Sequence, residues 1–148
     1  ETNTNAVTLR VAGVKSWFDW LESNFNITRR KSLTFEPPNL SELDQIKAFI
    51  VGYLDGDGSI YDSPSKDLRI SFRGTKQILT FIKFYFDLWY PNHKASKVYM
   101  SFGYPQYRIQ GHRAIKIIKD LRGLNLPFLE RKWNKPEVFH EWQKNNLT

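Results

Sequence analysis

One stretch of the sequence decides the fold, and it reads Ala48-Phe49-Ile50-Val51-Gly52-Tyr53-Leu54-Asp55-Gly56-Asp57-Gly58-Ser59-Ile60. Its first part is apolar enough for a buried helix, whereas the two acids and two glycines at 55–58 are poor helix formers and favour a turn. A glycine within a helix costs about 1 kcal/mol relative to alanine, so Gly52 indicates a packing reason for a small residue there. We therefore predict a helix that carries acids at its C-terminal end.

Upstream of this stretch the chain shows boundary signals. Ser41 and Asp44 have the spacing of a capping box, with Asp in place of Glu, so the helix should begin near Ser41. Prolines at 37 and 38 interrupt helical structure, and we interpret residues 28–39 as a linker. Residues 7–12 and 14–24 have the patterns of a short strand and a helix.

Downstream, apolar and polar residues alternate at 69–73, 97–102 and 106–110, which predicts half-buried strands. Residues 75–89 and 113–121 have helical spacing, and the second of these helices is basic on its outer side. The segments 129–133 and 137–145 are interpreted as peripheral packing. The strand residues expected to face the core are Ile70, Phe72, Val98, Met100, Phe102, Tyr107 and Ile109.

The opposite face of these strands has four cations and no carboxylate. A solvated sheet face usually mixes charge signs, so this bias favours contact with nucleic acid. The residues predicted on this face are Arg69, Ser71, Arg73, Lys97, Tyr99, Ser101, Gln106, Arg108 and Gln110.

Charge and composition narrow the classes of protein. The net charge is +7, and residues 66–132 alone contain 14 Lys or Arg against four Asp or Glu, a net +10. The chain has no cysteine, which excludes disulfides, thiolate metal sites and cysteine nucleophiles. No apolar run approaches the roughly 18 residues of a membrane span. A reducing intracellular compartment fits the absence of cysteine.

Residues 50–58 resemble the LAGLIDADG motif of homing endonucleases. The expected order of elements, over residues 40–123, is similar to the αββαββα repeat of that family, and the Leu-Glu-Arg-Lys at 129–132 resembles a segment that follows the last helix of such repeats. The resemblance implies an α+β fold whose antiparallel sheet binds double-stranded DNA. It also implies a site-specific endonuclease that leaves short 3′ overhangs, while an intron, an intein and a free-standing gene all stay open as its origin. Such an enzyme is expected inside the cell with access to DNA, in a prokaryote, a phage host or an organelle.

The resemblance assigns roles to individual residues. Asp57 matches the acid that holds Mg²⁺ (or Mn²⁺) beside the scissile phosphates, with Gly56 as a neighbouring metal contact. Hydrolysis of a phosphodiester needs such ions to activate water and to stabilise the leaving oxygen. Gly52 and Asp55 are assigned to the helix interface and its turn. Arg73 and Arg113 fall near assisting positions of the active site, and Ser59 and Tyr61 join the residues that contact DNA.

Only one motif is present, so a complete enzyme requires a homodimer or a second LAGLIDADG half. Residues 1–39 resemble the tail of a preceding repeat, which would make this chain the C-terminal half of a longer enzyme, and residues 40–148 form the repeat with a C-terminal helical extension. The motif departs from the family at Ile50 and Val51. Val51 is bulky where close helix approach favours small residues, which predicts a looser interface.

Other interpretations stay open from the sequence. A buried helix followed by a Gly-Asp turn can produce a nine-residue pattern without any function. A non-cleaving relative, either a transcription regulator or an RNA splicing maturase, would use the same sheet. A protein-interaction domain with acidic partners would also suit a basic face.

Overall fold

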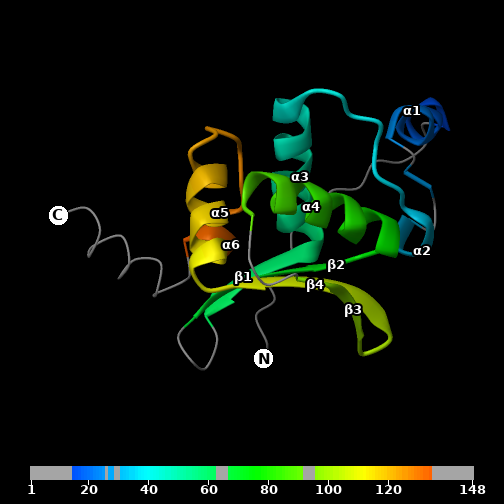
Figure 1. Ribbon diagram of the computed structural model, residues 1–148. Helices are drawn as coiled ribbons and strands as arrows, with labels where there is room; N and C mark the ends of the chain where they lie inside the picture. Colours follow the sequence, from blue (N-terminus) through cyan, green and yellow to red (C-terminus); the bar gives the residue numbers. More distant parts are fainter. Residues whose placement is uncertain (1–14, 26, 29–30, 63–66, 92–95, 135–148) are drawn as a thin grey trace, which may run out of the picture.

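The computed structural model describes residues 15–25, 27–28, 31–62, 67–91 and 96–134 (Figure 1). Six helices and four strands are present in this part of the chain. Their order is α1 (Lys15–Phe25), α2 (Lys31–Thr34), α3 (Leu43–Asp57), β1 (Gly58–Asp62), β2 (Leu68–Arg73), α4 (Lys76–Trp89), β3 (Val98–Ser101), β4 (Tyr104–Gln110), α5 (His112–Arg122) and α6 (Glu130–Trp133). The predicted αββαββα order is confirmed over α3 to α5.

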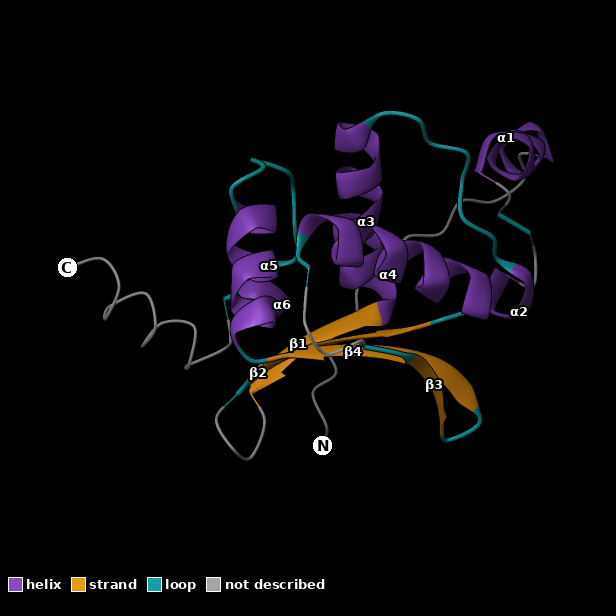
Figure 2. Cartoon of the chain, viewed as in Figure 1, coloured by secondary structure: helices purple, strands orange, loops and turns teal. Residues whose placement is uncertain are grey.

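The four strands form one antiparallel sheet in the order β1-β2-β4-β3. Helices α3, α4 and α5 cover one side of the sheet, and no described element covers the other (Figure 2). The α+β class is therefore confirmed.

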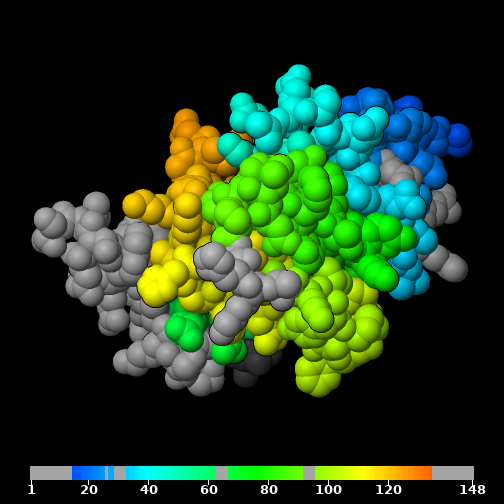
Figure 3. Space-filling view, viewed as in Figure 1, coloured from blue at the N-terminus to red at the C-terminus, as the bar shows by residue number. Residues whose placement is uncertain are grey.

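The core lies between the helices and the sheet. Each covering helix contributes a buried stripe, such as Ile46, Ile50 and Leu54 on α3, because apolar residues recur at three- and four-residue spacing. The predicted core positions Ile70, Phe72, Tyr107 and Ile109 are fully or almost fully buried beneath these helices. In the space-filling view α4 extends across the front of the molecule and α1 lies at the upper right edge (Figure 3).

The start of α3 differs from the prediction. The helix begins at Leu43 with Glu42 at the N-cap position, and no side chain makes a capping hydrogen bond there. Ser41 lies two residues before the helix and is not its cap. The predicted capping box is thus wrong, although the helix begins within two residues of the expected place.

Two predicted core residues at the end of β3 are exposed. Met100 is 66% exposed and Phe102 is 92% exposed. The strand has only four residues, and it ends in a two-residue turn at Phe102-Gly103, where both φ angles are positive. Strict alternation therefore fails at Phe102, which belongs to the turn, and Met100 lies where the hairpin extends beyond the helical layer. Val98, nearer the middle of the sheet, packs against the core.

The prediction that residues 129–133 pack at the periphery is wrong. Trp133 on α6 is fully buried, and its ring lies 5.5 Å from that of Phe128. The segment therefore closes the core at the end of α3 and β1.

The N-terminal region holds the predicted helix as α1, none of whose residues is buried. The predicted linker contains α2, and Phe35 beyond it packs against Phe49 and Tyr53 on α3. The strand expected at 7–12 and the helix expected at 137–145 lie outside the described residues. Among the helices that the structure describes, none is both long and apolar enough to cross a bilayer.

Candidate nucleic-acid interface and active site

The acid Asp57 lies where helix α3 meets the sheet. It is the last residue of α3, and β1 begins at the next residue. This abrupt change requires glycine at Gly58, because a Cβ there would lie 2.4 Å from Leu54 Cδ1 and 2.7 Å from the Leu54 carbonyl oxygen. Asp57 is exposed and makes no hydrogen bond or ion pair with the described part of the chain. Its carboxylate is therefore free to bind a ligand.

Asp55 has a different environment from Asp57. Its Oδ1 accepts a hydrogen bond of 2.6 Å from Trp133 Nε1, and its Oδ2 accepts one of 3.0 Å from the Leu129 amide. Both oxygens thus hold the segment around α6 against the end of α3. Asp55 thus fixes the last turn of α3 from within its own chain, and the turn predicted at 55–58 is wrong because the helix continues to Asp57 and β1 follows directly.

Lys132 contacts the end of α3, a role that its place in the sequence does not predict. Its Nζ donates hydrogen bonds to the carbonyl oxygens of Leu54, Asp55 and Gly58, at 3.2, 2.5 and 2.7 Å. Burial, with the neighbouring Arg131, lowers the pKa of the Lys132 ammonium, while the charges of Asp55 and Asp57 oppose that shift. The only sequence signal was the Leu-Glu-Arg-Lys segment, which by itself does not indicate that Lys132 caps α3.

The uncovered face of the sheet carries the predicted polar residues. The register pairs Arg69 with Gln110, Ser71 with Arg108 and Arg73 with Gln106, so these side chains share one face. Tyr99 and Ser101 on β3, and Ser59 and Tyr61 on β1, extend the same face. Lys97 is exposed directly before β3.

Contacts within this face orient several of its side chains. Ser59 Oγ lies 2.7 Å from Ser71 Oγ, and Tyr99 Oη donates to Gln106 Oε1 at 3.2 Å. The guanidinium of Arg108 lies 5.8 Å from the centre of the Tyr99 ring. The Nε atoms of Arg69 and Arg108 are buried and have no partner in the described structure. Such donors suit an acceptor supplied by a ligand.

A hollow of about 460 Å³ joins the end of α3 to this face. It brings together nine of the predicted site residues and leaves Arg69, Lys97, Tyr99 and Gln110 outside it, elsewhere on or beside the face. The hollow is lined by Gly56, Asp57, Gly58, Ser59, Tyr61, Ser71, Arg73, Ser101, Phe102, Gln106 and Arg108.

Arg73 is positioned in this hollow by Tyr53 on α3. Tyr53 Oη donates a 2.8 Å hydrogen bond to the Arg73 carbonyl oxygen. Burial, and the nearby Asp57 carboxylate, raise the pKa of the Tyr53 hydroxyl well above its ordinary value, so it remains a donor. Glycine at Gly74 leaves room for this hydroxyl, because a Cβ there would lie 2.0 Å from Tyr53 Oη and would displace it.

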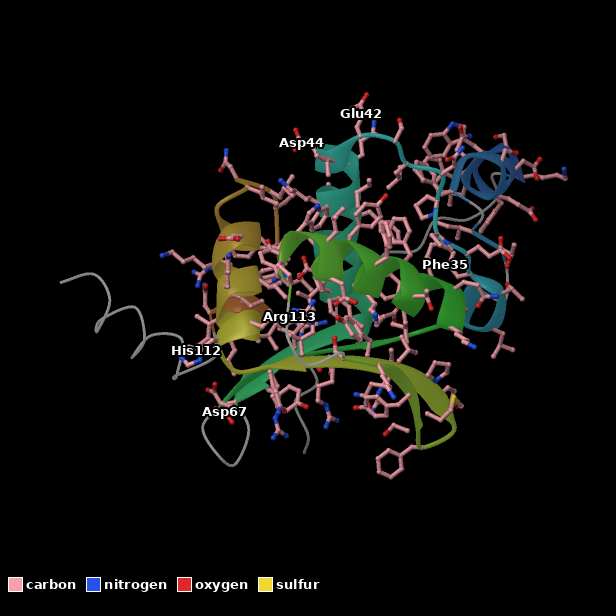
Figure 4. The ribbon with its side chains drawn as sticks, in the orientation of Figure 1. Phe35, Glu42, Asp44, Asp67, His112 and Arg113 are labelled. Carbon is pink, nitrogen blue, oxygen red and sulfur yellow. The ribbon has the colours of Figure 1, made fainter. Side chains whose placement is uncertain are left out.

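Arg113 lies apart from the hollow. Its guanidinium donates to Asp87 at 2.6 Å and to Ser96 at 2.9 Å, and its side chain is only 9% exposed. Figure 4 places Arg113 on the helical side of the sheet. The structure therefore does not bring Arg113 to Asp57 and gives it a structural ion pair.

The glycine in the middle of α3 lies on the outer side of the helix. Gly52 is exposed, and a Cβ there would meet nothing within 4 Å. Ala48 and Gly56 are also exposed on this helix. Val51 is buried in the core of its own chain at 2% exposure. The expectation that Val51 loosens a helix interface is therefore wrong, because its side chain does not reach the outer side.

The described residues contain no group of three or more His, Cys, Asp or Glu that could hold a metal ion by itself. Asp57 offers a free carboxylate, and Gly56 lies in the last turn of α3, where carbonyl groups lack partners within the helix. Carboxylate and carbonyl oxygens suit Mg²⁺, which retains several waters and shares its coordination with phosphate. The two residues thus fit part of a metal site.

A solved structure has the same arrangement of elements. The LAGLIDADG meganuclease I-AabMI, determined bound to uncleaved DNA, aligns with a TM-score of 0.50 and 27% identity over 68% of this chain. The chain has the LAGLIDADG fold. This chain covers 38% of the I-AabMI chain, so it corresponds to one half of that meganuclease. No family model and no curated protein matches the sequence. In the LAGLIDADG repeat described here, α3 carries the motif.

Proposed function

We propose that this chain is one half of a site-specific DNA endonuclease that hydrolyses phosphodiester bonds with a divalent metal. The supporting observation is the place of Asp57. Its exposed carboxylate shares one hollow with Arg73 and Arg108, at the edge of a sheet face on which the paired residues of β2 and β4 include no acid. Cleavage at Asp57 would thereby act on the same duplex that the sheet face binds.

The sheet face has the chemistry to read a duplex. Arginine can donate two hydrogen bonds to guanine and glutamine can bind adenine through base edges in the major groove. Gln106 is only 4% exposed but lines the hollow, and its amide oxygen accepts from Tyr99, which leaves the amide NH₂ as a donor. Arg69, Arg73 and Arg108 supply the positive charge that phosphates require.

At the acidic end, Asp57 and the Gly56 carbonyl would hold Mg²⁺ (or Mn²⁺). Such an ion lowers the pKa of a bound water and stabilises charge on the leaving oxygen. Lys132 has a separate effect, because its ammonium offsets the negative C-terminal end of α3. Without it, the free carbonyls would repel an approaching phosphate.

One acid does not complete the site, so the active enzyme is a homodimer or pairs with a second LAGLIDADG half. The small exposed residues Ala48, Gly52 and Gly56 on α3 allow a second helix to approach closely. Light scattering with and without duplex DNA measures this directly. A mass near twice 17.5 kDa supports a symmetric dimer, whereas a monomer in both conditions requires a separate partner half.

The interface is tested by Arg108→Ala. Loss of a base contact should weaken binding to a selected duplex by about 1–3 kcal/mol. Loss of a phosphate contact should reduce the slope of log K against log salt concentration by about one. Fluorescence anisotropy over a series of salt concentrations measures both quantities. Lys116→Ala on the helical side is the matched control and should have no effect. Equal affinity of the Arg108 variant and the parent at every salt concentration removes Arg108 from the interface.

Cleavage is tested by Asp57→Asn. The assembled enzyme is incubated with a randomised duplex library in Mg²⁺ or in EDTA, and the ends produced are sequenced. Asp57→Asn should abolish metal-dependent ends while it retains duplex binding, since the substitution removes charge and preserves shape. Equal cleavage by variant and parent would contradict the assignment. Binding without cleavage by the assembled parent would instead favour a non-cleaving regulator or maturase.

A further inference from the structure

The tip of the β3–β4 hairpin carries a residue that the turn does not favour. Ser101 pairs with Tyr104, so the turn consists of Phe102 and Gly103, with φ angles of 51° and 82°. Two-residue turns with both φ angles positive prefer Asn, Asp or Gly at the first position. A bulky aromatic residue is uncommon in this conformation. Local backbone geometry therefore gives no reason for Phe102.

Packing gives no reason either. The Phe102 side chain is 92% exposed, the highest value among the large apolar residues of the described structure. It belongs neither to the core nor to the half-buried residues packed against it. Exposure of an apolar ring to water is unfavourable. Neither the turn nor the core of the described structure therefore accounts for this ring.

The position of Phe102 indicates what its ring would contact. Phe102 lines the same hollow as Asp57, Arg73 and Arg108. The hairpin curls away from the helices, toward the side of the uncovered sheet face (Figure 2). A duplex whose phosphates lie beside the two arginines would bring its base pairs to the ring. Charge complementarity around the ring therefore selects a polyanion as the partner.

We propose that Phe102 is a wedge that stacks against a base step of the bound duplex beside the phosphates served by Asp57. The wedge rests on the proposed function. Apolar side chains inserted at a base step unstack it partially and kink the duplex, and aromatic stacking accepts any base. Phe102 would therefore position the scissile phosphates over the acid and would read flexibility of the step rather than its base edges.

The test compares the full chain with its Phe102→Asn variant, because Asn accepts positive φ and keeps the turn. The probe is a duplex selected for binding to the parent, with 2-aminopurine placed at each central position in turn. The parent should raise the fluorescence at one step, and the variant should abolish this rise. The variant should also bind about tenfold more weakly, which equals about 1.4 kcal/mol. Phe102→Trp should restore both signals.

The control is Phe84→Ala, which removes an aromatic ring that is 60% exposed on α4, in the helical layer. It should leave binding and fluorescence unchanged. Two results would overturn the wedge alone: an unchanged fluorescence rise in Phe102→Asn, or no rise at any central step with the parent bound. A parent that binds no duplex would overturn the proposed function as well. Thermal unfolding of each variant verifies that loss of signal is not loss of fold.

Discussion

At the scale of single residues, the two acids of the motif have separate tasks. Asp55 is engaged by Trp133 Nε1 and the Leu129 amide, whereas Asp57 has no hydrogen-bond partner in the described structure. Truncation of Asp55 leaves a buried indole N–H unpaired, which costs about 1–3 kcal/mol. Truncation of an exposed side chain without contacts usually changes stability by less than about 0.5 kcal/mol.

We therefore expect Asp55→Ala to lower the free energy of unfolding by about 2 kcal/mol and Asp57→Ala to leave it nearly unchanged. Urea denaturation of the two variants and the parent measures both values. Because the substitutions are identical and two positions apart, each variant is the control for the other. Equal destabilisation would show that the carboxylate of Asp57 also supports the fold.

At the scale of elements, α3 has one side buried in the core and another side on which Ala48, Gly52 and Gly56 are exposed in the described structure. Gly52 is exposed on the outer side with open space around its Cβ position. Alanine there should raise the free energy of unfolding of the isolated chain by up to about 1 kcal/mol, because glycine is the poorer helix former. The same methyl group should separate two α3 helices that cross closely and so weaken assembly.

We therefore expect Gly52→Ala to raise the stability of the chain and to weaken its association. Thermal unfolding at low concentration measures the first, and sedimentation over a concentration series, with duplex DNA present, measures the second. Gly56→Ala, which also adds a methyl group in open space, tests the end of the helix in the same way. Greater stability with unchanged association would mean that the partner lies elsewhere.

At the scale of the whole molecule, one ion-pair network joins α4 to α5. Asp87 accepts from Lys83 at 2.5 Å and from Arg113 at 2.6 Å. Burial alone would raise the pKa of the Asp87 carboxyl, but the hydrogen bonds and charges of Lys83 and Arg113 hold it below its ordinary value. A lowered pKa in the folded state stabilises the protein above the ordinary carboxyl pKa, and this contribution is lost as the pH falls further.

The Asp87→Asn variant should thus be less stable than the parent at neutral pH, in part because Arg113 loses its partner charge in a buried position. The difference should begin to shrink as the pH falls below about 4, the ordinary carboxyl pKa, and should be lost as the pH passes the lowered pKa of Asp87 in the folded parent. Urea midpoints over a pH series test this. A difference that stays constant from neutral to acid pH would show that the charge of Asp87 does not matter. Binding to duplex at neutral pH should be unaffected, since Arg113 lies outside the hollow.

The sequence by itself determined the elements whose signals are local. Apolar spacing in α4 and α5 and alternation in β2 and β4 follow from backbone periodicity, and the acid-glycine run at 55–58 marks the end of α3, so the order of these elements and the polar sheet face could be predicted. The exposure of Met100 and Phe102 could not be predicted, because burial at the end of a short strand depends on where the helical layer stops. Trp133, Lys132 and the partners of Asp55 could not either, since contacts over more than 70 residues leave no periodic trace. Only the tertiary structure brought Asp57, Arg73 and Arg108 into one hollow and set Arg113 apart from it, because proximity between distant segments is decided by packing of the whole core.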